Sequence, residues 1–230
     1  MKLALVGYGK MGRLIEHLAP NRGHEVVLTL DEHNNANGEG ITAANFEGID
    51  IAIDFSTPHT VVSNINRLAA LGVNMVIGTT GWTEEMPRVK ALVEERRIGL
   101  VWAPNFSIGV NIFQRVVSEA ARWLASQPEY EAWAWEIHHS EKKDAPSGTL
   151  LKLVAEMQKA GWDRNIDVAS NRAGSIPGTH EIGFDSAADT ITLRHTARSR
   201  QGFAMGAIDA AEWIAGKQGF YEFSEIIFRE

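Results

Sequence analysis

The segment Val6-Gly7-Tyr8-Gly9-Lys10-Met11-Gly12, near the amino terminus, decides the fold. It matches the pattern G-x-G-x-x-G and joins a short apolar run, Leu3 to Val6, to a helical pattern of apolar residues. In such a turn the first glycine permits a tight bend, the second lets the backbone approach a pyrophosphate, and the third lets helix and strand pack closely. The helix N-terminus adds free N–H groups and partial positive charge. The segment predicts a dinucleotide site.

An acidic residue at the end of the next predicted strand supports that site. Asp31 follows the apolar stretch Glu25 to Leu30, where a carboxylate can accept hydrogen bonds from the ribose hydroxyls of an adenosine. A glycine-rich turn without a ligand, or a flavin site, are the alternatives. Because strand, helix and downstream acid agree, we interpret residues 7–12 and Asp31 as a nicotinamide dinucleotide site.

The first hundred residues alternate apolar strands with helical patterns. Further strands are predicted over residues 49–55, 74–77 and 98–102, and a charged helix over 84–95. Thr57-Pro58 resembles an N-cap with proline at the first helical position, opening a helix to Leu71. Residues 32–48 are polar and rich in Asn and Gly, and are read as a loop or a short crossover. This rhythm predicts an α/β fold with a Rossmann-like, doubly wound parallel sheet.

The pattern changes after residue 105. A helix is predicted over 110–124, large and small residues alternate over 130–138, and the segments 180–184 and 190–194 alternate like paired strands. We expect a second α+β domain containing a mixed or antiparallel sheet, spanning residues 106–202. The dinucleotide-binding domain is expected to span residues 1–105, joined by the C-terminal tail, 203–230.

Two further segments follow predicted strands at their carboxyl ends, where open α/β sheets bind ligands. They are Gly78-Thr79-Thr80-Gly81 and Ala103-Pro104-Asn105-Phe106. Glycines and small hydroxyls suit a close approach to a nicotinamide ribose, although ordinary turns use the same residues.

The densest polar stretch runs from Glu136 to Thr149 and joins a strand to a helix. Its helix entrance, Pro146-Ser147-Gly148-Thr149, offers hydroxyls and free N–H groups that suit a carboxylate. Lys142 and Lys143 add positive charge, and His138-His139 offers proton donors near neutral pH. Both histidines can take part only if the strand ends there, because neighbours in a strand face opposite ways.

Other interpretations of this stretch remain. The histidines could bind a metal, although no third ligand with suitable spacing is evident, or they could lie on a solvated charged surface. A second basic patch, Arg194 to Arg200, could complete a site for a polyanionic substrate or form an exposed strand end.

Composition excludes several classes of protein. The chain of 230 residues is 44% hydrophobic and 22% charged, which is typical of a soluble globular protein. The net charge of −7 disfavours non-specific nucleic-acid binding, and the absence of cysteine excludes disulfides and thiolate metal sites. No apolar run is long enough to span a bilayer. Because the apolar N-terminus reaches Gly7 almost at once, we expect no signal peptide and a cytoplasmic protein.

Taken together, these motifs resemble the 4-hydroxy-tetrahydrodipicolinate reductase (dihydrodipicolinate reductase) family of diaminopimelate and lysine biosynthesis. The resemblance is carried by residues 6–12, 53–56, 78–81 and 103–107. It is most specific at His138-His139, followed by Lys142 and Asp144-Ala145-Pro146-Ser147-Gly148-Thr149. It implies a homotetramer of two-domain subunits that uses NADH and/or NADPH on a small dicarboxylate substrate.

The resemblance also implies residue roles. His138 is similar to the family's catalytic acid/base and Lys142 to its proton donor. The implied substrate contacts are His139, Ser147, Gly148 and Thr149. The implied cofactor contacts are Gly7, Tyr8, Gly9, Lys10, Met11, Gly12, Asp31, Gly78, Thr79, Thr80, Ala103, Pro104, Asn105 and Phe106. Reducing a ring C=C conjugated to an imine needs a hydride at one end and a proton at the other, which a hydride donor and a positioned acid satisfy.

The sequence departs from the family pattern in the short segment 32–48 and in Asp31-Glu32-His33, which lacks the arginine often found after the acid.

Two other functions remain possible. One is another NAD(P)-dependent oxidoreductase of similar architecture, such as an amino-acid dehydrogenase. The other is a dinucleotide-sensing regulator without catalysis.

Overall fold

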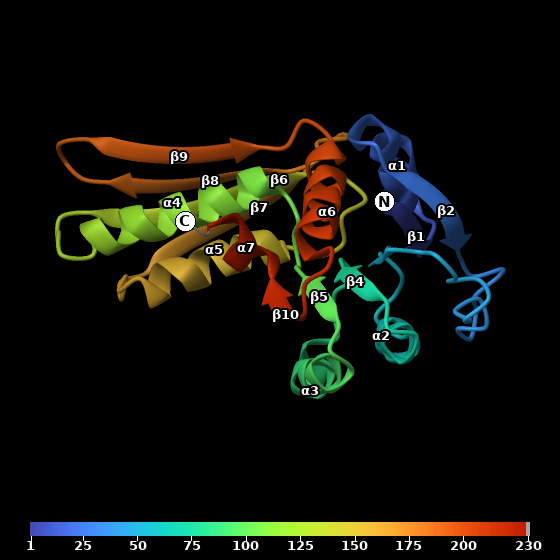
Figure 1. The fold of residues 1–230 in the computed structure, drawn as a ribbon. Helices are drawn as coiled ribbons and strands as arrows, with labels where there is room; N and C mark the ends of the chain where they lie inside the picture. The colour runs from blue at the N-terminus through green and yellow to red at the C-terminus, as the bar shows by residue number, and fades with distance from the viewer. Residues whose placement is uncertain (229–230) are drawn as a thin grey trace. The chain divides into compact units, whose positions relative to one another are not determined.

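The computed structural model describes residues 1–228, which form two compact units (Figure 1). The first unit contains Met1–Ile108 together with the chain from Gln201 onward, and the second contains Gly109–Arg200. Each unit has its own sheet and its own hydrophobic core.

The first unit is built on a parallel sheet of six strands in the order β10-β5-β4-β3-β1-β2. The strands are β1 (Lys2–Val6), β2 (Glu25–Leu30), β3 (Ile51–Asp54), β4 (Asn74–Ile77), β5 (Gly99–Trp102) and β10 (Gly219–Glu222). Short buried runs such as Ile51–Asp54 are typical of strands that are covered on both faces. The predicted doubly wound parallel sheet is confirmed.

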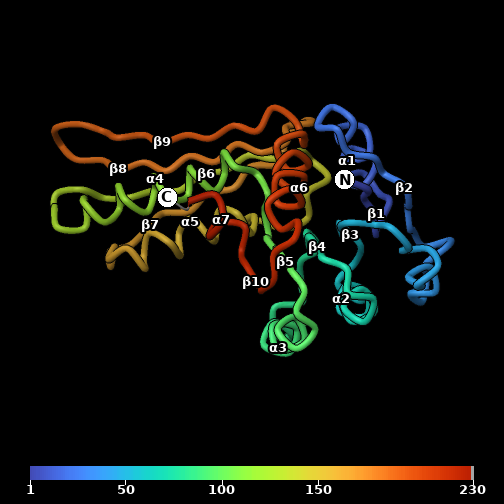
Figure 2. The backbone as a smooth tube through the Cα atoms, viewed as in Figure 1, coloured from blue at the N-terminus to red at the C-terminus, as the bar shows by residue number. Residues whose placement is uncertain are grey.

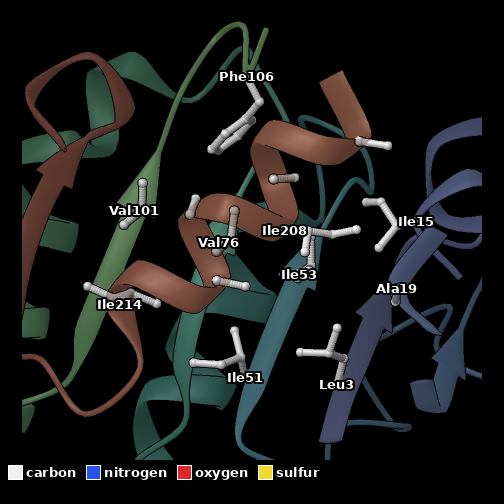
Figure 3. Packing of buried hydrophobic residues seen from close by; sticks show 14 of the residues in the cluster. Leu3, Ile15, Ala19, Ile51, Ile53, Val76, Val101, Phe106, Ile208 and Ile214 are labelled. Carbon is white, nitrogen blue, oxygen red and sulfur yellow. The ribbon is translucent and has the colours of Figure 1, made fainter. Parts of the chain in front are cut away.

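Alternate residues of each strand pack on opposite layers of helices. Leu3 and Leu5 pack with α1 (Lys10–Leu18) and α6 (Gln201–Ile214), whereas Ala4 and Val6 pack with α2 (Val61–Ala70) and α3 (Met86–Arg96). Figure 3 shows α6 lying over the sheet, with Ile208 next to Ile53 and Ile214 next to the strand that carries Val101. These two layers hold the carboxyl ends of β1, β3 and β4, and therefore the loops that follow them, in fixed positions.

Two details of this unit differ from the sequence-based expectation. The Thr57-Pro58 helix start is wrong: α2 begins at Val61, because the Thr57 carbonyl accepts the N–H groups of Thr60 and Val61 and forms a turn first. The strand β10 and the short helix α7 (Phe223–Ile227) were not predicted. The segment between β2 and β3 contains turns but no helix (Figure 2), as the loop interpretation expected.

The second unit contains a mixed sheet in the order β7-β6-β8-β9, which confirms the predicted α+β region. Its strands are β6 (Glu131–His138), β7 (Ile166–Arg172), β8 (Thr179–Asp185) and β9 (Thr190–Thr196). The β8–β9 hairpin is antiparallel as predicted, and β6 pairs parallel with β7, which patterning did not predict. Helices α4 (Ile108–Leu124) and α5 (Gly148–Lys159) pack on one face of this sheet.

Alternation along β6 determines which of its side chains face those helices. Ala132, Ala134, Glu136 and His138 are buried, while the intervening residues are half-buried or exposed. Two polar residues, Glu136 and His138, therefore point toward the side of the sheet that the helices cover. No helix in the part of the chain that the structure describes is both long and apolar enough to cross a membrane.

Candidate active site

The three glycines of the first loop have different surroundings. Gly7 has φ +92°, and a Cβ there would lie 2.3 Å from the Phe55 carbonyl oxygen; a Cβ at Gly12 would lie 2.5 Å from the Gly7 oxygen. A Cβ at Gly9 would meet nothing within 4 Å. The outer glycines are thus required by packing, whereas the space at Gly9 is open to a ligand.

Helix α1 begins directly behind that open space. Gly9 is its N-cap and makes no side-chain cap, and the first intrahelical bond joins Arg13 N to Gly9 O at 3.1 Å. The N–H groups of the first turn therefore point out of the helix end, where the helix dipole favours a phosphate. The residues present fit the pyrophosphate of a dinucleotide.

A cavity of about 430 Å³ opens on one side of this loop. Its lining includes Gly7, Tyr8, Gly9 and Asp31, four of the residues predicted to contact a cofactor. Its wall also includes Glu32, next to Asp31, and residues that were not predicted as contacts: Arg13, His33, Ser56, Thr57 and Asn64. Arg13 is held near the loop because its guanidinium lies 5.4 Å from the centroid of the Tyr8 ring.

A second cavity, of about 410 Å³, opens on the other side of Gly9. Its lining includes Lys10 and Met11 together with Gly78, Thr79 and Thr80. The glycine loop and the segment after β4, far apart in the sequence, thus meet at one site. Ala103 and Phe106, in contrast, are buried, and Phe106 packs on Phe223 with ring centroids 5.0 Å apart.

A buried carboxylate links the loops that line these cavities. Asp54, at the end of β3, is fully buried and accepts hydrogen bonds from Ser56 (N 2.9 Å, Oγ 2.7 Å), Thr79 Oγ1 (2.7 Å) and Asn64 Nδ2 (3.0 Å). Burial raises the pKa of Asp54, although these donors oppose the shift. We infer that Asp54 holds Ser56 and Thr79 in place along the cavity walls.

In the second unit, Ser147 caps α5. Its Oγ accepts the Leu150 N–H at 3.2 Å, and the residue is buried. Both donors of Ser147 face Glu136: N at 2.8 Å from Oε1, and Oγ in a short bond to Oε2. A Cβ at Gly148 would meet nothing within 4 Å, so the helix entrance is open at the next residue.

Glu136 is the centre of a buried polar cluster. Besides Ser147, it accepts a hydrogen bond from Arg172 Nη2 at 2.9 Å. Burial alone would raise the pKa of Glu136, but the hydrogen bonds from Ser147 and Arg172 outweigh burial and hold it below its usual range. The carboxylate is therefore ionised at neutral pH.

Two histidines flank that carboxylate. His138 Nδ1 and His180 Nε2 each lie 3.4 Å from Glu136 Oε2, and the two rings are 5.1 Å apart at 74°. Burial lowers the pKa of both, that of His180 to about 4. His138 Nδ1 is buried and has no hydrogen-bond partner among the described residues. Burial thus disfavours the protonated form of both histidines next to a negative charge.

The loop before α5 holds the predicted lysine. Lys142 Nζ lies 2.7 Å from Asp144 Oδ1, and this bond lowers the pKa of Asp144. Arg172 fixes the loop from beneath by donating to the Lys142 carbonyl at 3.3 Å and to the Asp144 carbonyl. Lys143 is exposed and His139 half-buried. The carboxylate of Asp144 thus pairs with the positive charge of Lys142 in this structure.

The carboxylate oxygen and two ring nitrogens of Glu136, His138 and His180 lie within 4.8 Å of one another, which suits a metal by distance. The guanidinium of Arg172 and both donors of Ser147 already bind this carboxylate, however. A dication there would meet a fixed positive charge, so we assign no metal.

Sequence reasoning missed Arg172, His180 and the central role of Glu136. The sequence did hold one signal for Glu136: it lies two residues before His138 in the same strand, and residues two apart share a face. Arg172 and His180 had none, because they reach the cluster only through pairing of β6 with β7 and β8. Arg194, in the second basic patch, pairs instead with Glu181 at 3.3 Å.

Hydride transfer coupled to protonation needs a dinucleotide site and a positioned acid. The first unit has the features of the former and the second those of the latter, so the chain falls in the class of two-domain, nicotinamide dinucleotide-dependent reductases. Family models narrow this class: that of the dihydrodipicolinate reductase N-terminus matches residues 1–106, and that of its C-terminus matches residues 109–227. The chain belongs to the dihydrodipicolinate reductase family.

Individual relatives agree with that assignment. A 4-hydroxy-tetrahydrodipicolinate reductase from Christiangramia forsetii is 35% identical over 99% of this chain and 98% of its own length. One from Archaeoglobus fulgidus is 34% identical over 99% of this chain and 100% of its own. The solved structure of a dipicolinate-bound dihydrodipicolinate reductase from Paenisporosarcina sp. TG-14 shares the fold, with a TM-score of 0.83 at 24% identity over 98% of this chain and 99% of that one.

Proposed function

We propose that this protein reduces 4-hydroxy-tetrahydrodipicolinate to tetrahydrodipicolinate with NADH or NADPH. The observation that carries the proposal is the buried His138 cluster beside the open N-terminus of α5, in a chain whose family members of known name are reductases of this substrate. The dicarboxylate chemistry fits, because a substrate carboxylate can bind at the helix entrance and beside Lys142.

The proposed roles follow from these positions. His138 acts as acid/base and Lys142 as proton donor, while His139, Gly148 and Thr149 bind the substrate. Ser147 shapes the entrance from beneath, since its donors already bind Glu136. The cofactor supplies a hydride when bound. The reaction then consumes one proton and releases the 4-hydroxyl as water, and Lys142 and His138 are the groups proposed to supply that proton.

The proposed cofactor contacts are the loop residues 7–12, Asp31, residues 78–80 and Ala103 to Phe106. The direct test of function adds NADH and freshly generated substrate and follows the absorbance of the reduced nicotinamide. Turnover supports the proposal. Binding of NADH without turnover would indicate a regulator, and turnover only with another substrate would indicate a different oxidoreductase.

We expect NADH to be used at least as well as NADPH. Asp31 and Glu32 line the cavity on the side of β2, where a 2′-phosphate would meet their negative charge. The measurement is kcat/KM with each cofactor. A preference for NADPH above about tenfold, or 1.4 kcal/mol, would contradict the charge argument. It would point to Arg13, the cation in the same cavity wall, and Arg13→Ala would then remove the preference.

We also propose a homotetramer assembled through the second unit. The face of its sheet opposite the helices carries Trp133, Trp135 and Ile137, all half-buried rather than covered. A Cβ at Gly183 would lie 2.1 Å from the Trp133 ring, so the ring packs directly on the Gly183 backbone. Light scattering at micromolar concentration should give four chains, and a monomer would contradict the proposal.

The expected cytoplasmic location is a proposal that cell fractionation tests.

A further inference from the structure

The buried carboxylate of Glu136 has bonds to two parts of the candidate site at once. Oε1 accepts hydrogen bonds from the Ser147 N–H and from Arg172 Nη2. Oε2 accepts a hydrogen bond from the Ser147 hydroxyl and lies 3.4 Å from His138 Nδ1. Ser147 caps the helix that offers the anion site, and His138 is the proposed acid. A single ionised group therefore contacts both the acid and the helix entrance.

We propose that Glu136 is a positioning residue for this reaction: through Oε2 it orients His138 and stabilises its protonated form, and through Ser147 it holds the entrance of α5. The inference rests on the proposed role of His138. Glu136 itself is fully buried beneath the site and is not proposed to touch the substrate.

The geometry favours this role over a purely structural one. A carboxylate that served only to fix Ser147 and Arg172 would not need His138 Nδ1 at 3.4 Å, whereas His180 Nε2, at the same distance, also lies 3.2 Å from Ser147 Oγ. Among the described residues, His138 Nδ1 has no hydrogen-bond partner, and Glu136 Oε2 lies within ion-pair distance of it at 3.4 Å. Donation from Nδ1 fixes the tautomer and leaves Nε2 to exchange a proton. On the Nε2 side, Gly178 leaves open a position where a Cβ would lie 2.8 Å away.

The charges around His138 define the effect of removing Glu136. Burial lowers the pKa of His138 and the charge of Glu136 raises this pKa. Of the other charged groups that face His138, Lys142 and Arg172 lower its pKa and Asp144 raises it. The His180 ring packs beside the His138 ring. Without the Glu136 charge, burial and two cations remain nearly unopposed. The protonated form of His138 would then persist only at lower pH.

The test compares Glu136→Gln with Glu131→Gln, the same change at an exposed position of the same strand. NMR titration of the His138 ring, assigned by its loss in His138→Gln, gives its pKa without reference to activity. Because an opposite charge within about 4–6 Å shifts a pKa by about 1–3 units, we expect the His138 titration to move down by at least about one unit in E136Q only. An unchanged titration would overturn the proposal.

Kinetics supply an independent measurement. A general acid must be protonated, so kcat/KM falls as pH rises through its pKa, and E136Q should move this falling limb to lower pH. Above both limbs, kcat/KM should drop about tenfold per unit moved. Glu136→Asp, which keeps the charge but withdraws it, should give an intermediate limb and serves as the test variant if E136Q does not fold. A lower kcat with the limb unmoved in both variants would indicate a structural role only.

A double variant separates this inference from the proposed function. If Glu136 acts on the acid through His138, then E136Q in a His138→Gln background should leave kcat within about threefold of H138Q while still raising the KM for the substrate. Multiplying losses in kcat would overturn the inference. If H138Q alone retained near-normal kcat, the proposed role of His138 would fail instead, whatever E136Q did.

Discussion

Replacing His138 with Gln or Lys142 with Ala is expected to lower kcat by about 10²–10⁴, the range for a removed general acid or base. NADH affinity should stay nearly unchanged in both variants, because the glycine loop belongs to the other unit of the chain. The double variant should lose less than the product of the single losses, since residues that act as a unit are non-additive. Steady-state kinetics and NADH fluorescence titration measure both quantities.

Lys143→Ala is the matched control for Lys142→Ala. Lys143 is the adjacent lysine and is exposed, whereas Lys142 is half-buried and paired with Asp144 at 2.7 Å. We expect Lys143→Ala to cost much less in kcat. If Lys143→Ala abolished turnover while Lys142→Ala did not, the assignment of the proton donor would be wrong by one residue.

Gly7→Ala is expected to lower the stability of the free protein, whereas Gly9→Ala is expected to weaken the binding of NADH. A Cβ at Gly7 combines a positive φ with a 2.3 Å approach to the Phe55 oxygen. Each of these costs about 1–3 kcal/mol, so we expect a loss of about 3 kcal/mol in the free energy of unfolding. Denaturant melts of the free protein measure this loss.

Gly9→Ala provides the contrast within the same loop. Nothing lies within 4 Å of a Cβ there, so the stability of the free protein should change by less than about 0.5 kcal/mol. The added methyl group would occupy the space proposed for the pyrophosphate, so the Kd for NADH should rise about tenfold or more. Unchanged NADH affinity in Gly9→Ala would place the pyrophosphate elsewhere.

The sequence alone determined the fold class and the candidate motifs of this protein, because both depend on local patterns. The G-x-G-x-x-G turn requires glycine at Gly7 and Gly12 wherever strand and helix pack this closely, and short apolar runs between helices imply a parallel sheet. The polar stretch from Glu136 to Thr149 could likewise be identified from its residue types at a strand-to-helix junction. Elements with weak patterns were missed: β7 lies at a sheet edge and is mostly exposed, and β10 lies at the edge of the other sheet with all four residues only half-buried.

Only the tertiary structure decided which distant residues meet. Arg172 and His180 reach Glu136 because β6 lies between β7 and β8, and no local pattern specifies that strand order. The same holds for Thr79, which reaches Asp54 through the pairing of β3 with β4. Burial, and with it the depressed pKa of His138 and His180, is likewise a property of the packed layer rather than of the chain. Sequence thus identified the candidate side chains, and packing set their partners and their burial.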